Sequence, residues 1–284
     1  MTKAQSIRIT ILLYLATMII GLLSLNLVID SFNLFISTII IDVIMTIIVF
    51  VFSIKYNNSS LYDPYWSVIP VFILLMWMYV SVTFSLPVIV VLLVVLVWAI
   101  RLTSNWAINL KSYDYEDFRY QDFRAQFPKT YLLISFSAIH MFPTAIVLLA
   151  LYPIYAVITG KILYVSLIFI GSFIMILGAL ISFYADNQLR SYKKLYPEES
   201  IKNGLWKYSR HPNYFGEVLF WVGVAIAGLS TGFGIDIVLG ATAMWVLFNF
   251  YSVPKMEQKL LNNKPDYQQI IDEVPRFMFW KRGN

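Results

Sequence analysis

The chain alternates long apolar stretches with short polar segments along its whole length. A helix needs about 17 to 25 mostly apolar residues to cross the hydrocarbon core of a membrane. Eight stretches reach or approach this length, near residues 7–29, 34–54, 67–84, 86–102, 131–158, 162–184, 213–229 and 235–253. The pattern therefore predicts an all-α fold, a polytopic helical membrane bundle of about eight transmembrane helices.

The connections between these spans fit the same prediction. The Ser85, Leu86, Pro87 region separates the third and fourth spans, because a proline removes a helical hydrogen bond and interrupts a helix. The glycine-rich segment 228–234 predicts a second tight turn, between the seventh and eighth spans. The first apolar run is too long for the hydrophobic region of a signal peptide, and no small-residue cleavage pattern follows it, so we expect a retained span.

The basic residues indicate an orientation. Of the 21 Lys and Arg residues, 20 fall in segments that share one side of the membrane if the N-terminus is cytoplasmic, and Lys161 is the exception. Because cytoplasmic loops carry an excess of Lys and Arg, we expect both termini in the cytoplasm. The net charge of +5 then collects on one membrane face. Anionic membrane lipid or an anionic ligand is the expected partner there, and nucleic acid is not.

Composition limits the available chemistry. The chain is 59% hydrophobic and 13% charged, unlike a soluble protein. It has no cysteine and only two histidines, which excludes thiolate chemistry and a zinc site built from several histidines, so no metal site is expected. No repeat or linker divides the sequence. We therefore expect one integral-membrane domain over 1–284, with an N-terminal helix pair over 1–58 that carries no signature. No pattern specifies an oligomeric state.

The most polar part of the chain lies between the sixth and seventh spans. Asp186, Arg190 and Lys193 follow the sixth span at spacings of four and three, so they share one face if that helix continues. This face is either an ordinary juxtamembrane helix with snorkelling cations or a polar cluster aimed at an anionic cofactor.

A dense motif, GLWKYSRHPNYFGE, covers residues 204–217. Pro212 suits the first turn of a helix, so we expect the seventh span to begin there. Arg210 and His211 then lie at the helix mouth, where free backbone N–H groups and the helix dipole favour a phosphate or carboxylate.

Two further polar residues follow on the same helix. Asn213 and Glu217 are one turn apart on a common face. An acid this far into a span usually serves a function or pairs with a charge. A structural salt bridge from Glu217 to Arg101 or Arg190 is the alternative.

Other polar residues within the spans have plain structural explanations. His140 lies just before Met141 and Pro143, and its imidazole either satisfies the backbone carbonyl freed by the proline or serves as a substrate or proton-relay group. Asp42, in the second span, has a buried partner, lies at the membrane interface or serves a function. The match of Gly228 to Gly232 to a serine-hydrolase motif is attributed to chance, because it falls in a helical turn and no histidine follows.

The motif at 204–217 closely resembles that of a bacterial membrane family of uncharacterised proteins in the steroid 5-alpha-reductase clan, which has a 3-oxo-5-alpha-steroid 4-dehydrogenase-like C-terminal domain. The resemblance extends over 59–284. Further matching segments are Asp63-Pro64-Tyr65-Trp66-Ser67, Trp98-Ala99-Ile100-Arg101-Leu102, Asp117-Phe118-Arg119-Tyr120, Asp186 to Lys194, and Tyr267 to Phe279.

The resemblance implies an integral-membrane enzyme that encloses NADPH between its helices, with the cofactor phosphates facing the cytoplasm. It places the cofactor near the polar segment and the motif that follows. The cofactor-binding candidates are Asp186, Arg190, Lys193, Tyr208, Arg210, His211, Asn213, Tyr214 and Glu217. Planar and multiply donating cations suit the 2′-phosphate and pyrophosphate of such a cofactor.

The implied reaction is hydride transfer from NADPH to an activated carbon–carbon double bond of a lipophilic substrate such as a steroid, sterol or lipid-like enone. Steroid reductases use a glutamate and a tyrosine near the substrate carbonyl, and the match is weaker here. Trp98 stands near the expected tyrosine, and Asp63 is the acid nearest to the expected glutamate. Tyr79, Tyr115 and Tyr120 are the alternative phenols. The candidate catalytic residues are Asp63, Arg101, Tyr120 and His140.

Two other functions compete with this interpretation. A methyltransferase that uses S-adenosylmethionine and resembles the isoprenylcysteine carboxyl methyltransferases would share the Arg210-His211-Pro212 segment and a similar C-terminal tail. Asn213 and the cluster from Asp186 to Lys193 favour a phosphorylated nicotinamide cofactor instead. A transporter or a non-catalytic membrane protein would leave the motif at 204–217 unexplained, and no inverted repeat supports transport.

Overall fold

The computed structural model describes residues 1–232 and 234–277. Every regular element in these ranges is helical. Eight helical segments of the described chain are long and apolar enough to cross a membrane, which confirms the all-α, polytopic prediction. They are Lys3–Val28, Leu34–Lys55, Ser59–Val80, Leu86–Asn109, Tyr131–Thr159, Val165–Leu195, Pro212–Thr231 and Asp236–Asn263.

The chain folds as two compact units, Met1–Gly160 and Lys161–Asn284, here called unit 1 and unit 2. The boundary falls in the connection between the fifth and sixth spans. The helix pair expected over 1–58 and the motif-bearing region after it do not coincide with this division. A single integral-membrane domain over 1–284 stays a prediction.

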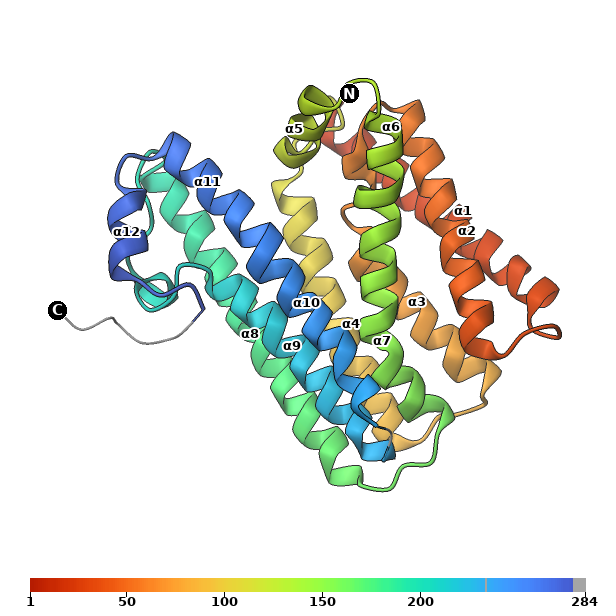
Figure 1. Cartoon of the computed structure of the whole chain (residues 1–284). Helices are drawn as coiled ribbons and strands as arrows, with labels where there is room; N and C mark the ends of the chain where they lie inside the picture. Colours follow the sequence, from red (N-terminus) through yellow and green to blue (C-terminus); the bar gives the residue numbers. More distant parts are fainter. Residues whose placement is uncertain (233, 278–284) are drawn as a thin grey trace. The chain divides into compact units, whose positions relative to one another are not determined.

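Unit 1 contains five spans and a short helix that lies outside them (Figure 1). Helix α1 packs against α2, and α3 packs against both α4 and α7. The elements of unit 1 are α1 (Lys3–Val28), α2 (Leu34–Lys55), η1 (Ser59–Tyr62), α3 (Tyr65–Val80), α4 (Leu86–Asn109), α5 (Phe118–Gln126), α6 (Tyr131–Ile134), η2 (Ser135–Met141) and α7 (Phe142–Thr159).

Local sequence explains where these helices begin. Thr2 and Gln5 form a capping box at the start of α1, and the Asn33 side chain caps α2 by accepting from the Ile36 N–H. Pro87 lies in the first turn of α4, as its missing N–H requires. The tight connection predicted between the third and fourth spans is therefore present, between Val80 and Leu86.

The fifth span is not a uniform α-helix. Residues Ser135–Met141 form a π-helical turn between α6 and α7, and Pro143 follows in the first turn of α7. A proline leaves a carbonyl of the preceding turn without its helical partner, and π-turns occur where the helical hydrogen-bond ladder is interrupted in this way. This turn places the His140 side chain in the interior of unit 1, where none of its surface is exposed.

Unit 2 contains three spans and a polar cap. Its elements are α8 (Val165–Leu195), η3 (Gly204–Lys207), α9 (Pro212–Gly228), η4 (Leu229–Thr231), η5 (Ile235–Val238), α10 (Leu239–Leu247), η6 (Phe248–Ser252), α11 (Val253–Asn263) and α12 (Tyr267–Glu273). Helix α8 continues through Lys193, which is the condition for Asp186, Arg190 and Lys193 to share one face, and α9 begins at Pro212 as the sequence predicts. The last span combines α-helical turns with a π-helical turn over η6.

Glycines bring α8 and α9 into close contact. A Cβ atom added to Gly178 would lie 2.5 Å from the Gly216 carbonyl oxygen, and one added to Gly223 would lie 2.6 Å from the Gly171 oxygen. Only glycine permits backbones to approach this closely. At the polar end of the pair, the Ser182 hydroxyl donates to the Asn213 carbonyl at 2.8 Å. The two helices therefore hold their polar ends in a fixed register.

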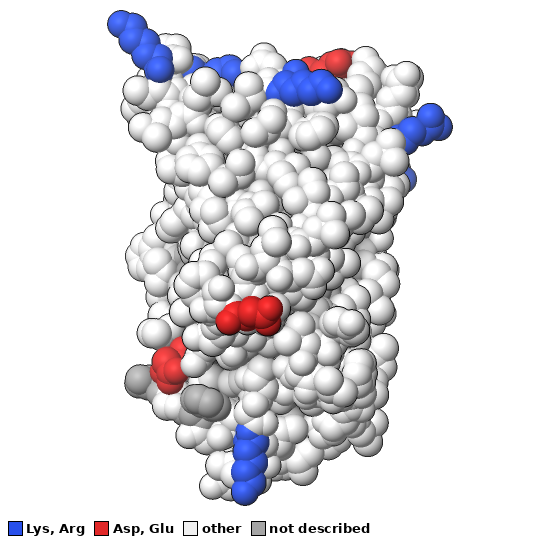
Figure 2. Space-filling view, turned by 90° about the vertical axis from the view of Figure 1, so that its right-hand side faces the viewer, with Lys and Arg blue, Asp and Glu red and all other residues white. Residues whose placement is uncertain are grey.

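The outer surface is suited to lipid. Many large apolar side chains on the long helices are exposed, among them Leu23, Leu27, Leu133 and Phe173. Figure 2 shows one face of the molecule, where Lys and Arg side chains lie near the two ends and a wide band between them carries very few charges. This distribution fits a multi-pass membrane protein. The cytoplasmic placement of the termini stays a prediction.

Candidate functional site

The polar end of unit 2 joins residues from the sixth and seventh spans. The Asn213 side-chain amide donates to the Asp186 carboxylate at 3.1 Å, so two of the predicted cofactor residues are in direct contact. Arg190, one turn after Asp186, donates to the Asn187 side chain at 3.0 Å. Glu217 is half-buried in α9, one turn after Asn213. The continuation of α8 beyond the apolar span makes this arrangement possible.

Arg210 and His211 lie in a buried cluster around Glu257. The Glu257 carboxylate accepts from Arg210 Nε at 2.8 Å and lies 3.1 Å from His211 Nε2. Its other oxygen accepts from Arg276 Nη2 at 2.9 Å. The Tyr267 hydroxyl lies 3.4 Å from the same imidazole nitrogen. We call these five residues the Glu257 cluster.

Backbone contacts join the same two segments. The N–H groups of Arg210 and His211 donate to the carbonyls of Pro275 and Arg276, and the Ser209 hydroxyl also donates to the Arg276 carbonyl. The segment after α12 therefore covers the start of α9. Burial lowers the pKa of His211, against the opposing effect of its contact with Glu257. The mouth of α9, where the sequence predicts an anion, is thus lined by protein groups that are already hydrogen-bonded.

The sequence does not single out Glu257 or Arg276 as site residues, and it offers Tyr267 as a residue of the C-terminal segment that could close the cofactor site. Their signal was weak, because the segment after the last span mixes acids, bases and aromatic residues without periodicity. One clue was available: two adjacent cationic residues at a helix mouth, Arg210 and His211, call for a counter-charge when they are buried.

The remaining cofactor candidates lie at the surface of unit 2 or against the Glu257 cluster. The Tyr214 ring lies edge-on to the His211 ring, with centroids 5.8 Å apart. Tyr208 and Lys193 are exposed. Lys193 is within electrostatic range of Lys259 and Lys264, and it forms no ion pair with any described residue. Lysines gathered in this way repel one another, and a bound anion relieves that repulsion.

In unit 1 the structure joins two of the four predicted catalytic residues. The Tyr120 hydroxyl, on α5, donates to the Asp63 carboxylate at 2.7 Å. Arg119 pairs with Asp117 at 2.7 Å beside them, and the Asp117 N–H donates to the Ser60 hydroxyl. Burial and the Asp63 carboxylate both raise the pKa of Tyr120. Asp63 and Tyr120 therefore form a carboxyl–phenol pair just before the start of α3.

The other two catalytic candidates lie in different surroundings. Arg101 is half-buried in α4. His140 Nδ1 lies 2.8 Å from the Ser135 carbonyl, and Nε2 lies 3.0 Å from the Ser53 hydroxyl. A carbonyl can only accept, so Nδ1 carries a hydrogen. The structural explanation for His140, an imidazole that satisfies a helix carbonyl, is thus observed, with Ser135 as the partner. A relay role stays a prediction.

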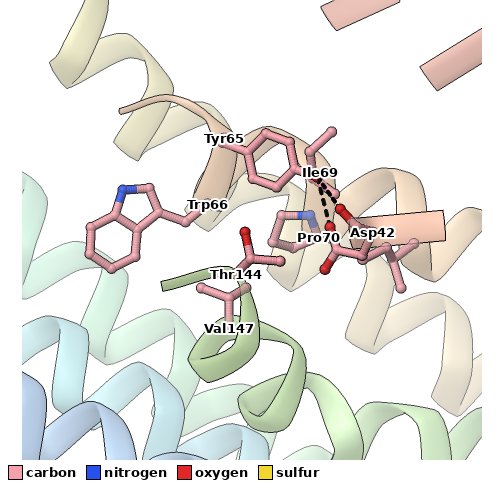
Figure 3. Close-up of a pocket in the computed structure, with 8 residues that line it drawn as sticks. Asp42, Tyr65, Trp66, Ile69, Pro70, Thr144 and Val147 are labelled. Atoms are coloured by element: carbon pink, nitrogen blue, oxygen red, sulfur yellow. Dashed lines mark hydrogen bonds between the residues drawn. The ribbon is translucent and has the colours of Figure 1, made fainter. Parts of the chain in front are cut away.

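A narrow pocket opens inside unit 1 beside Asp42 (Figure 3). Its free volume is about 10 Å³, room for about one water molecule. The side chains that line it are Asp42, Tyr65, Trp66, Ile69, Pro70, Ile73, Thr144 and Val147. The Tyr65 hydroxyl donates to Asp42 Oδ1 at 2.7 Å, as the dashed lines show (Figure 3). In the part of the chain that the structure describes, no group of three His, Cys, Asp or Glu residues could hold a metal ion.

The fold and these polar centres define a class: an all-α membrane protein with buried acid, phenol and arginine clusters. Residues 49–274 match the family described as "Protein of unknown function (DUF1295)". This match covers most of the chain, and the protein belongs to that family. The matching segment Tyr267 to Phe279 extends past residue 274, where the family match ends. Residues 278 and 279 of this segment lie outside the described part of the structure.

A shorter similarity links the chain to a curated enzyme. Over 64 residues it is 39% identical to 3-oxo-5-alpha-steroid 4-dehydrogenase 1 of Bos taurus, a match that covers 21% of this chain and 24% of the bovine protein. Together with the family, this match confirms the resemblance to steroid 5-alpha-reductase-like proteins. No solved structure matches the chain.

Proposed function

We propose that this protein is an integral-membrane reductase that transfers a hydride from NADPH to an activated carbon–carbon double bond of a lipophilic substrate, such as a steroid, sterol or lipid-like enone. The observation that carries the proposal is the local identity to the bovine steroid dehydrogenase within a family match that covers most of the chain. Cofactor and substrate class are both part of the proposal.

The residues of unit 2 fit a phosphorylated nicotinamide cofactor. Lys193, together with Lys259 and Lys264, supplies positive charge for phosphate groups. The contact between Asp186 and Asn213 presents a carboxylate and an amide, which suit ribose hydroxyls and a carboxamide. Arg210 and His211, held by Glu257, would fix the position of the helix start behind them. When bound, NADPH supplies the hydride.

The residues of unit 1 fit the substrate. Hydride addition to an enone places negative charge on the carbonyl oxygen, and a hydrogen-bond donor aimed at that oxygen lowers the barrier. The Tyr120 hydroxyl is the proposed donor, and the Asp63 carboxylate, 2.7 Å away, holds it in position.

A binding measurement tests the cofactor. Protein purified in detergent should melt at a higher temperature with NADPH, because a ligand that binds only the folded state stabilises it, by about 2.7 kcal/mol at a hundred times its dissociation constant. S-adenosylmethionine should leave the melting temperature unchanged. Stabilisation by S-adenosylmethionine alone would replace the reductase with the methyltransferase alternative.

Two variants localise the site within the same assay. Lys193→Ala removes one of three neighbouring lysines and should weaken NADPH more than NADH if this lysine faces the 2′-phosphate. Lys111→Ala, in the loop after α4 of unit 1, is the matched control for the loss of an exposed lysine and should change neither affinity. An equal loss for the two cofactors would remove Lys193 from the 2′-phosphate site.

A further inference from the structure

We propose that Ser60 is a positioning residue for the pair formed by Asp63 and Tyr120. It contacts both of the chain segments that carry the pair, and in this way it sets the phenol opposite the carboxylate. The inference deepens the proposed function and rests on it for the role of the Tyr120 hydroxyl as a donor to the substrate. The arrangement of the two segments is a property of the described residues alone.

Two segments of unit 1 lie side by side in a constant register. The first covers residues 58–63, and the second covers residues 115–120, at the start of α5. Four hydrogen bonds between them join residues that are 57 positions apart: Asn58 with Tyr115 at 3.3 Å, Ser59 with Glu116 at 2.8 Å, Ser60 with Asp117 at 2.8 Å and Asp63 with Tyr120 at 2.7 Å. The segments therefore run in the same direction, and the candidate catalytic pair is the last contact of the series.

Ser60 uses three polar groups to hold this register. Its N–H donates to Asn58 Oδ1 at 2.8 Å, and its carbonyl accepts from the Asp63 N–H at 3.2 Å. Its hydroxyl accepts from the Asp117 N–H at 2.8 Å. Only 4% of its surface is exposed. One buried residue thus holds the backbone of the carboxylate on one side and the beginning of α5 on the other.

Asp117 passes this position on to Tyr120. It is the N-cap of α5, where its carboxylate accepts from the Arg119 N–H at 2.9 Å, and its carbonyl accepts from the Tyr120 N–H at 3.0 Å. The first turn of α5 is therefore fixed relative to its cap. A displacement of the Asp117 N–H also displaces the Tyr120 hydroxyl.

The Ser60 hydroxyl differs from other serine hydroxyls of unit 1. Those of Ser53 and Ser67 donate to carbonyls three or four residues earlier in the chain, the usual solution for serine in a helix. The Ser60 hydroxyl instead accepts from a backbone N–H 57 residues away. Because backbone N–H groups need an acceptor, removal of this hydroxyl forces the Asp117 N–H to move toward water.

Such a movement matters for the proposed reaction. A donor stabilises the charge on a substrate oxygen only at hydrogen-bond distance from it, and a misplacement of 1 Å can slow a reaction by about a hundredfold. The Tyr120 hydroxyl is the proposed donor, and Asp63 alone does not fix the backbone that carries it. The Ser60 hydroxyl supplies that second point of attachment.

A fluorinated tyrosine in place of Tyr120 tests the position of the phenol without cofactor or substrate. Fluorine NMR of the purified protein in lipid nanodiscs follows its ionisation as the pH is raised. Burial and the Asp63 carboxylate both raise the pKa of Tyr120, so a looser contact lowers it. Asp63→Asn removes the charge and gives the pKa for a lost contact. Ser60→Ala should shift the pKa of the wild type down toward that value.

Ser112→Ala is the matched control. Ser112 is also a buried serine, and its hydroxyl accepts from the Asp114 N–H, a contact that does not reach η1. This variant should leave the pKa of the label unchanged. Ser60→Cys keeps the volume of the side chain but offers only a weak acceptor, so it should lower the pKa as well. It also serves as the test if Ser60→Ala does not fold.

An unchanged pKa in a folded Ser60 variant, or an equal fall in Ser112→Ala, would overturn the proposal. If reductase activity is found, Ser60→Ala should lower kcat by about tenfold to a hundredfold. NADPH should still raise its melting temperature, because the cofactor candidates lie in unit 2. An unchanged kcat would reject the positioning role. Failure of NADPH to bind the wild type would overturn the reductase and leave the pKa result standing.

Discussion

Glu257 is the residue on which the polar centre of unit 2 depends. It is buried, and it is shared by Arg210, His211 and Arg276. A buried carboxylate with three cationic or polar neighbours is stable only while its partners remain, because an uncompensated charge in such a site is costly. The residue thereby links α11 to the start of α9 and to the segment after α12.

Glu257→Gln should lower the free energy of unfolding by about 3–5 kcal/mol, the usual cost of removing one member of a buried ion pair. Denaturant titration in detergent measures this loss. Glu198→Gln changes an exposed acid of unit 2 and should stay within about 0.5 kcal/mol of the wild type. A loss no larger than that of the control would show that the cluster does not stabilise the fold.

Sequence reasoning reached some of these residues and missed others for a physical reason. Asp63 and Tyr120 were both proposed from the family resemblance, but their contact at 2.7 Å joins positions 57 residues apart, and no spacing rule predicts it. Asp186 and Asn213 were easier to propose, because Asp186 lies just after the apolar part of α8 and Asn213 lies in the first turn of α9. Long-range pairs become visible only when the packing of the helices is known.

At the scale of helices, the apolar pattern located all eight spans, but it placed the ends of the sixth and eighth at residues 184 and 253, whereas these helices continue to Leu195 and Asn263. It could not show that the fifth and last spans contain π-helical turns, because hydropathy records composition and not the hydrogen-bond ladder. The close approach of α8 and α9 was equally hidden, although Gly171, Gly178, Gly216 and Gly223 repeat at intervals of seven. That interval places each pair on one face of its helix.

Gly178→Ala tests this approach. Alanine normally stabilises a helix relative to glycine, but the new Cβ would meet backbone atoms of α9 at 2.5–2.6 Å, so the helices must separate. We expect a loss of about 1–3 kcal/mol, as for other overpacked sites. Leu180→Ala, on the exposed side of α8, is the control. Unchanged or increased stability of Gly178→Ala would show that the contact is looser than described.

At the scale of the whole molecule, the positions of the basic residues make a prediction about topology. The connection after α7 is external and the segment after α8 is cytoplasmic if the N-terminus is cytoplasmic. The chain has no cysteine, so single cysteines can be introduced without background. Thr159 and Glu198 are both exposed and lie in these two segments.

In intact cells, an impermeant thiol reagent should label Thr159→Cys and not Glu198→Cys. Permeabilised cells should label both, which controls for accessibility. Equal labelling of the two variants in intact cells would contradict the eight-span arrangement. Labelling of Glu198→Cys alone would show that the protein has the opposite orientation in the membrane.

The contacts between residues 209–211 and residues 275–276 also have a consequence for biosynthesis. Ser209 and Arg276 are 67 residues apart, and α9, α10, α11 and α12 lie between them. A ribosome makes the motif first and its buried partners much later. Arg210 and His211, at the start of α9, must therefore stay solvated by water or lipid headgroups until α11 and the segment after α12 are in place. Quality control that recognises unassembled membrane segments would act on this protein during that interval.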